Sequence, residues 1–245
     1  MELTSILLGQ VVRLLKADSP IGGIYMPMAV QALKDRYGFV QVPTVLQDFD
    51  LTKGITLSHG RFVINSSSQQ REIVIYQLQI YDDGVVVSTQ ADIDDANLFV
   101  DDFINWSIKA YGSKIDPRIP IQSFYNSHVE FHSDISLDDF FPGSSEIGKG
   151  IVGALESYGQ KPLPFQVSSV SLYIDTTQTK AVIPGSFTLA RREKVPFSTN
   201  LYFSSAPLKT KDHLALLGKI ENLASAKASP KSKSDSGEPK RSLIL

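Results

Sequence analysis

Two histidines and a glutamate stand at alternate positions of one short segment, His128-Val129-Glu130-Phe131-His132. Side chains of a strand alternate between its two faces, so His128, Glu130 and His132 would share one face and Val129 and Phe131 would point to the core. Imidazole and carboxylate groups are ligands that zinc or iron accepts. The segment predicts either a metal site of a hydrolase-like enzyme, completed by a ligand from elsewhere, or the solvated polar face of an antiparallel sheet.

Motifs of other reactions are absent. The zinc-protease pattern needs Glu directly after the first histidine, where Val129 stands, and neither Gly-x-Ser-x-Gly nor a phosphate-binding glycine loop occurs. A serine with His59 or His213 could be assembled by the fold, as in almost any protein. The acidic residues of 92–95 lack calcium-loop spacing and fit a helix start. We therefore lean against catalysis and expect no cofactor, with zinc or iron as the alternative.

One segment of the body combines cationic and aromatic side chains. Its members are Arg191, Arg192, Phe197, Tyr202 and Phe203. Arginine and aromatic residues are enriched among the residues that dominate protein interfaces. The segment predicts a contact surface for another protein, although the arginines could instead pair with nearby acids and the aromatic rings could fill the core.

The last residues, 225–245, are rich in Ser, Lys, Pro and Gly and end on Leu243, Ile244 and Leu245. Such a composition cannot bury enough surface to offset the entropy of ordering, so we expect a disordered basic tail. An extended C-terminal peptide can add a strand to the sheet edge of a partner. The three apolar residues predict such a docking peptide, against the alternatives of docking on the chain's own body, a degradation signal or no role.

Composition limits the class of protein. The chain has 245 residues, 42% hydrophobic and 20% charged, which is enough for a substantial core. A net charge of −2 argues against direct nucleic-acid binding by the body. The sequence has no cysteine and no apolar run of the roughly 20 residues that a membrane helix needs. We expect a cytoplasmic protein without a transmembrane segment, whose partner is another protein, and leave a homo-oligomer open.

Apolar residues at the amino terminus recur at helical spacing. They are Leu3, Ile6, Leu7, Val11, Leu14 and Leu15. The pattern predicts an amphipathic helix that packs on the core. Its alternative use, on a lipid surface, is a third functional hypothesis, peripheral membrane association.

Further along the chain, turn and periodicity signals predict a helix around 29–36 that ends at Gly38, a hairpin of 71–81 and 85–90 around an Asp-Gly turn, and a helix that ends at Gly112. The second half repeats this order. We expect an extended segment at 127–133, helices at 145–157 and 211–224, and extended segments between them at 165–175, 183–193 and 195–205.

A weak internal repeat supports this division, because Ala32-Leu33 and Tyr37-Gly38 can be aligned with Ala154-Leu155 and Tyr158-Gly159. The sequence predicts an α+β fold, mainly antiparallel sheet with helices on one face. The body would span 1–224, with two similar half-units at about 1–115 and 120–224, unless the similarity is coincidental. The leading functional hypothesis is a non-catalytic protein-binding or assembly module.

Overall fold

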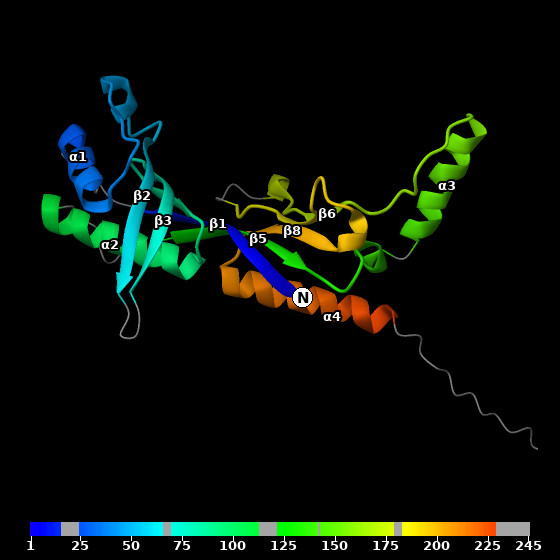
Figure 1. Ribbon diagram of the computed structural model, residues 1–245. Coiled ribbons are helices and arrows are strands. Elements are labelled where there is room, and N and C mark those ends of the chain that lie inside the picture. The colour runs from blue at the N-terminus through cyan, green and yellow to red at the C-terminus, as the bar shows by residue number, and fades with distance from the viewer. Residues whose placement is uncertain (16–24, 66–69, 113–121, 142, 179–182, 229–245) are drawn as a thin grey trace, which may run out of the picture.

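The computed structural model describes residues 1–15, 25–65, 70–112, 122–141, 143–178 and 183–228. Within these residues, the eight strands form a single antiparallel sheet in the order β2-β3-β4-β1-β5-β8-β7-β6. Helices accompany the sheet (Figure 1), and the predicted α+β class with a mainly antiparallel sheet is confirmed.

The elements follow one order twice. The first half contains β1 (Glu2–Leu14), α1 (Met26–Tyr37), the 3-10 turn η1 (Leu46–Phe49), β2 (Ile55–Asn65), β3 (Gln70–Ile80), β4 (Gly84–Thr89) and α2 (Ile93–Tyr111). The second contains β5 (Gln122–His132), η2 (Leu137–Phe140), α3 (Ser144–Ser157), β6 (Ser169–Leu172), η3 (Thr176–Gln178), β7 (Phe187–Arg191), η4 (Phe197–Thr199), β8 (Leu201–Ala206) and α4 (Thr210–Ala228). Each half is therefore a strand, a helix, three strands and a helix.

The first strand of each half lies at the centre of the sheet. β1 pairs with β4 on one side and with β5 on the other, and β5 pairs in turn with β8. Outward from this centre the order is β1-β4-β3-β2 in one direction and β5-β8-β7-β6 in the other. The halves are thus arranged symmetrically about the β1–β5 pair.

The predicted amino-terminal helix is wrong, because Glu2–Leu14 form β1. Its register against β5 shifts between Leu3 and Ser5 and again between Ile6 and Leu8. Each shift moves the following side chains to the other face of the sheet, so strict alternation is lost and the apolar spacing resembles that of a helix. The membrane hypothesis loses its basis, since it required an amphipathic helix.

The other predicted helices and the hairpin are confirmed. α1 ends at Gly38 and α2 at Gly112, both with φ of 64°, the left-handed conformation that glycine adopts without steric cost. The Asp92 side chain accepts a hydrogen bond from the Asp94 N–H at the start of α2. β3 and β4 pair around the expected Asp-Gly turn.

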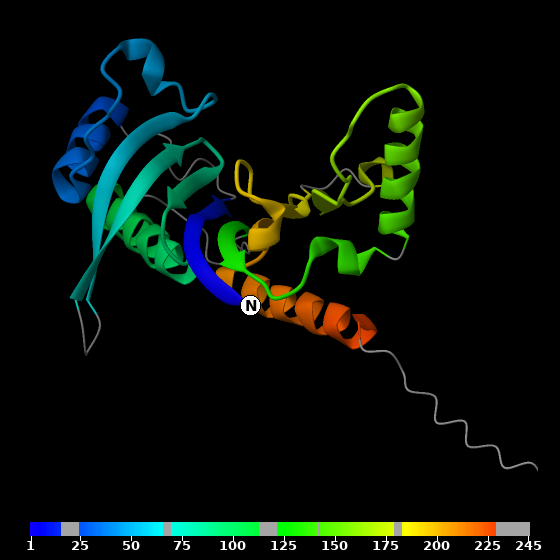
Figure 2. The same cartoon turned by 45° about the vertical axis from the view of Figure 1, so that its right-hand side comes forward.

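Helices α1, α2 and α4 cover one face of the sheet. Tyr37 of α1 and Phe99 of α2 are in ring contact at 5.0 Å within the large core of the first half. Beneath α4 lies a smaller cluster that includes Val129, Leu189 and Leu217. Figures 1 and 2 show α2 and α4 along the same side of the sheet, whereas α3 extends beyond its β6 end.

The body is longer than predicted at its carboxyl end, because α4 continues to Ala228. Residues 225–228 are therefore helical rather than part of a tail. The remainder of the predicted disordered tail, 229–245, with the docking peptide Leu243, Ile244 and Leu245, lies outside the described residues.

Candidate binding surface on the α3 arm

Helix α3 and the returning segment 158–166, together called the α3 arm, expose apolar side chains that other helices of the protein bury. Within α3 only Gly148 is buried, whereas α1 buries five of its residues. The most exposed large apolar side chains of the arm are Ile147 at 68%, Tyr158 at 73% and Leu163 at 84% of their surface. A stable helix normally buries its apolar stripe, so this face lacks a packing partner within the described chain.

Two open grooves follow the helix. One, of about 430 Å³, lies toward β6 and is lined by the apolar side chains of Phe141, Ile147, Ile151, Phe165 and Val167. The other, of about 510 Å³, lies between α3 and the returning segment, and its lining mixes Val152, Pro162 and Pro164 with Asp138, Lys149 and Glu156. Apolar surface with charged residues around it is the composition of a protein contact site.

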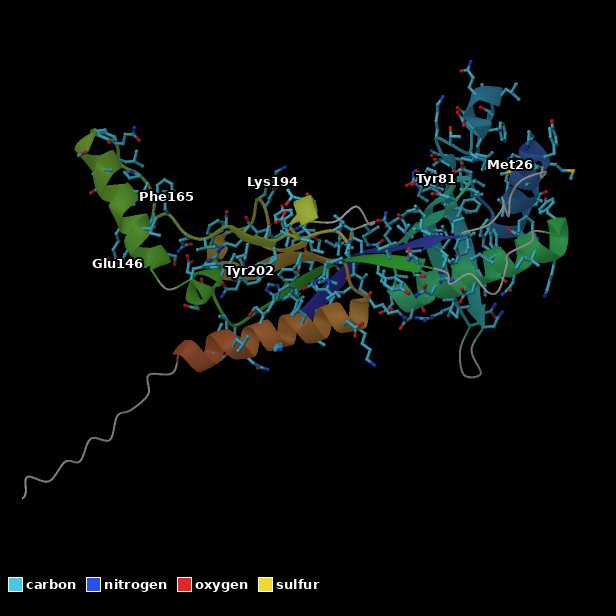
Figure 3. The ribbon with its side chains drawn as sticks, turned by 180° about the vertical axis from the view of Figure 1, so that it is seen from behind. Met26, Tyr81, Glu146, Phe165, Lys194 and Tyr202 are labelled. Carbon is cyan, nitrogen blue, oxygen red and sulfur yellow. The ribbon has the colours of Figure 1, made fainter. Side chains whose placement is uncertain are left out.

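The helix and the returning segment are in close contact at Gly148. A Cβ atom at this position would lie 2.6 Å from the carbonyl oxygen of Phe165, so only glycine permits the approach. Figure 3 shows Phe165 beside the helix that carries Glu146. The two parts of the arm are therefore held together by backbone packing.

A buried arginine fixes the base of the arm. Arg191 of β7 donates from Nη2 to Asp138 Oδ2 at 2.8 Å, just before the arm, and from Nε to the Val167 carbonyl at 2.9 Å, just after it. Asp138 also accepts from the Val167 N–H at 2.8 Å. Because both ends of the arm meet at the Arg191 guanidinium, the direction in which the arm leaves the sheet is fixed by a satisfied polar cluster.

This cluster changes the role of two residues that the sequence assigned to a contact surface. Arg191 and Tyr202 are buried, at 7% and 2% exposure. The Tyr202 hydroxyl accepts from the Leu137 N–H and donates to the Ile135 carbonyl. Both side chains are thus structural parts of the second half, and neither lies on its surface.

The other three residues of that segment remain accessible. Phe197 is 40% exposed and stacks on the Arg191 guanidinium, with Cζ 4.5 Å from the ring centroid. Arg192 is ion-paired with Glu130 at 2.8 Å, and Phe203 is in ring contact with His128. Arg192 and Phe203 thus lie on the face of the sheet that carries His128 and Glu130, whereas Phe197 contacts Arg191 of the opposite face.

The His128, Glu130 and His132 side chains share one face of β5, and Val129 and Phe131 are buried on the other, as alternation predicts. Glu130 is ion-paired with Arg192, and His132 Nδ1 lies 3.2 Å from the Thr199 carbonyl oxygen. Burial lowers the pKa of His128. No group of three or more His, Asp or Glu side chains among the described residues is placed to hold a metal ion.

A serine–histidine arrangement does form at His213 of α4, which is fully buried. Its Nδ1 lies 2.8 Å from Ser127 Oγ, and its Nε2 lies 2.9 Å from Ser204 Oγ. Ser204 donates its only proton to the Thr188 carbonyl, so Nε2–H of His213 donates to Ser204 and Nδ1 accepts from Ser127. Burial lowers the pKa of His213 to about 4. A base–hydroxyl pair sealed from solvent cannot reach a substrate, and the cluster is structural.

Sequence reasoning located α3 and its boundaries but missed the exposure of its apolar side chains. Ile147 and Ile151 are four residues apart, a spacing that indicates one apolar stripe but not what covers it. The three glycines at 148, 150 and 153, unusual inside a helix, were the available signal for close approach or weak packing.

No protein-family model matches the sequence, and no curated protein matches it either. None of the helices in the described ranges is both long and apolar enough to cross a membrane. The candidate surface therefore rests on the geometry of the chain itself.

Proposed function

We propose that this chain is a non-catalytic protein-binding or assembly module that binds through the α3 arm. The observation that carries the proposal is the combination of an unpacked apolar helix face with a base fixed by Arg191. A preorganised apolar surface loses little conformational entropy on binding, which favours association.

The polar clusters of the second half support the same function. Both ring nitrogens of His213 are hydrogen-bonded within the buried Ser–His–Ser cluster, and Glu130 is ion-paired with Arg192. Neither arrangement presents a reactive group to a substrate, whereas the arm presents contiguous apolar surface.

The proposal is tested by capture of proteins from the native cell extract on the immobilised full chain. The double variant Ile147→Asp with Ile151→Asp places two charges on the exposed stripe and should abolish capture without unfolding the chain. Leu46→Asp is the matched control, because Leu46 is 83% exposed in the first half and should retain capture. Equal capture by the chain and its double variant would remove the arm as the binding surface.

A second docking element is the C-terminal peptide Leu243, Ile244 and Leu245. Its support is its sequence, an apolar end after a polar segment long enough to span roughly 50 Å when extended. A chain that ends at Arg241 should lose any partner that this peptide recruits and keep those that bind the arm. A cytoplasmic location is part of the same proposal and rests on the sequence.

A further inference from the structure

The first half shows how its first helix packs. Tyr37, at the end of α1, is 4% exposed, contacts the Phe99 ring of α2 and donates its hydroxyl proton to Asp102 Oδ2 at 2.7 Å. Arg36 forms an ion pair with the same carboxylate at 2.9 Å. The last turn of α1 is thus joined to α2 by an aromatic contact and an ion pair, and α1 covers the edge strand β2.

The second half contains a corresponding helix and tyrosine, but this helix does not pack on α4 as α1 packs on α2. Tyr158 follows α3 as Tyr37 ends α1, and each tyrosine precedes a glycine with positive φ. Tyr158 is 73% exposed, and Leu172, on the α4 side of the edge strand β6, is 63% exposed. The site that α1 fills in one half is therefore open in the other.

Charged residues of α3 and α4 occupy the positions of the ion pair between α1 and α2, but with opposite signs. Lys219 is the tenth residue of α4, as Asp102 is the tenth of α2. Glu156 lies in the last turn of α3, as Arg36 lies in the last turn of α1. Neither Glu156 nor Lys219 forms an ion pair with any residue that the structure describes. An α3 helix placed beside α4 would pair Glu156 with Lys219.

The chain's own α3 cannot make this contact in the observed arrangement. Both ends of the arm are held by Arg191, whose side chain is 4% exposed, and Gly148 packs on the returning segment. Folding α3 back over β6 would require this buried cluster to open and would leave its polar groups without partners. A second copy supplies an α3 helix without that cost.

The exposed area is sufficient for such an association. The large apolar side chains that are exposed between residues 141 and 174 are Phe141, Ile147, Ile151, Tyr158, Leu163, Phe165, Leu172, Tyr173 and Ile174. Together they expose on the order of 1,000 Å², which compares with roughly 800 Å² per partner in a standard specific interface.

We propose that the partner of the arm is a second copy of this chain, and that the two copies exchange α3 helices. Each α3 lies beside α4 and over β6 of the other copy, as α1 lies beside α2 and over β2 within one copy. The contacts are Tyr158 on the surface of α4 and Glu156 with Lys219, made twice about a two-fold axis. This inference rests on the proposed function and names its partner.

Charge reversal distinguishes exchange between copies from folding back within one. Sedimentation equilibrium of the full chain should show a dimer, and Glu156→Lys or Lys219→Glu alone should raise the dimer dissociation constant roughly tenfold, because each homodimer then contains two like-charge contacts. An equimolar mixture of the two variants should recover wild-type affinity, because mixed dimers contain one native and one reversed pair. Circular dichroism should be unchanged, since both positions are exposed.

The chain has no cysteine, which allows a second measurement. Tyr158→Cys mixed with Lys219→Cys should form a disulfide-linked dimer under oxidation, more than either variant alone, whereas Leu46→Cys mixed with Lys219→Cys should not.

Several results would overturn the exchange. They are a monomer at all concentrations, a dimer that the mixture does not rescue, or an internal disulfide in a monomer that carries both cysteines. A monomer that still captures another protein through Ile147 and Ile151 would refute the second copy as partner but keep the proposed function. A monomer without capture would refute both.

Discussion

The two halves of this molecule share one order of elements but differ in what covers the sheet. In the first half α1 and α2 enclose a large apolar core. In the second, α4 covers a smaller cluster and the α3 arm leaves the sheet (Figure 2). One topology thus forms a closed core in the first half and an open surface in the second, depending on whether its first helix packs inward.

The interiors differ as well. The fourth residue of α2 is the buried Ala96, and the fourth residue of α4 is the buried His213 with its two serine partners. Apolar packing in one half is thus replaced by a hydrogen-bonded cluster in the other. Such a cluster demands a defined arrangement of β5, β8 and α4, which gives the second half a fixed geometry despite its smaller core.

Substitutions of the matched tyrosines at the ends of α1 and α3 should differ most in their effect on stability. Tyr37→Ala removes a buried ring and should lower the free energy of unfolding by about 4 kcal/mol. Tyr158→Ala, at an exposed position, should change it by less than about 0.5 kcal/mol in dilute solution. Urea denaturation of both variants measures the difference, and equal losses would contradict the contrast between the halves.

Neighbouring arginines provide the next comparison. Arg191→Met leaves Asp138 and the Val167 carbonyl without their buried partner and should cost at least about 3 kcal/mol. Arg192→Met breaks only the partly exposed pair with Glu130 and should cost less than about 1 kcal/mol. Thermal unfolding of the two variants measures the difference between their losses of stability. If Arg191→Met were as mild as its neighbour, the base of the arm would not depend on this residue.

The pH dependence of stability should arise largely in the second half. The pKa of His213 is about 4 in the folded protein against an ordinary value of 6.5, because burial and the nearby His128 disfavour its charged form. Between these pH values the unfolded chain binds the extra proton, so the free energy of unfolding falls as pH falls, by about 3 kcal/mol between pH 7 and pH 4.

His213→Gln should flatten this dependence, although His128, whose pKa is lowered by burial, keeps a slope of the same sign. His132→Gln, which removes an imidazole from an exposed position, is the matched control. Urea denaturation at several pH values between 4 and 7 measures all three proteins. An unchanged slope in His213→Gln would assign the acid sensitivity to other groups.

Substitutions of two glycines of α3 should change stability least. Gly153→Ala meets no atom within 4 Å of the new Cβ and should stabilise the helix by roughly 0.5–1 kcal/mol. Gly148→Ala gains the same helix propensity but collides with the Phe165 carbonyl, so it should separate the helix from the returning segment. Amide hydrogen exchange in α3 should slow in the first variant and not in the second.

The sequence predicted most elements because their signals are local. Gly38 and Gly112 end helices through their own conformation, and the Asp-Gly turn fixes the β3–β4 hairpin. The sequence-based prediction failed at β1, because two register shifts against a distant strand break the alternation of the side chains in β1. Pairing with β4 and β5 is a tertiary effect that no local periodicity contains.

Burial explains the errors in the predicted site. Arg191 and Arg192 are alike in sequence, yet one is enclosed by the ends of the arm and the other faces solvent with Glu130. His213 was named only as one histidine that a serine could approach, and its two serine partners lie 86 and 9 residues away. The burial of Arg191 and the serine partners of His213 both depend on which strands become neighbours in the sheet.

The central position of β1 also determines how the chain can be assembled during synthesis. The amino-terminal residues leave the ribosome first, but one edge of β1 stays unpaired until β5 has been made. An isolated first half would present this long apolar strand as an open edge, which favours aggregation. The halves are therefore expected to behave as one cooperative unit, and cutting the chain between them should yield insoluble fragments rather than two domains.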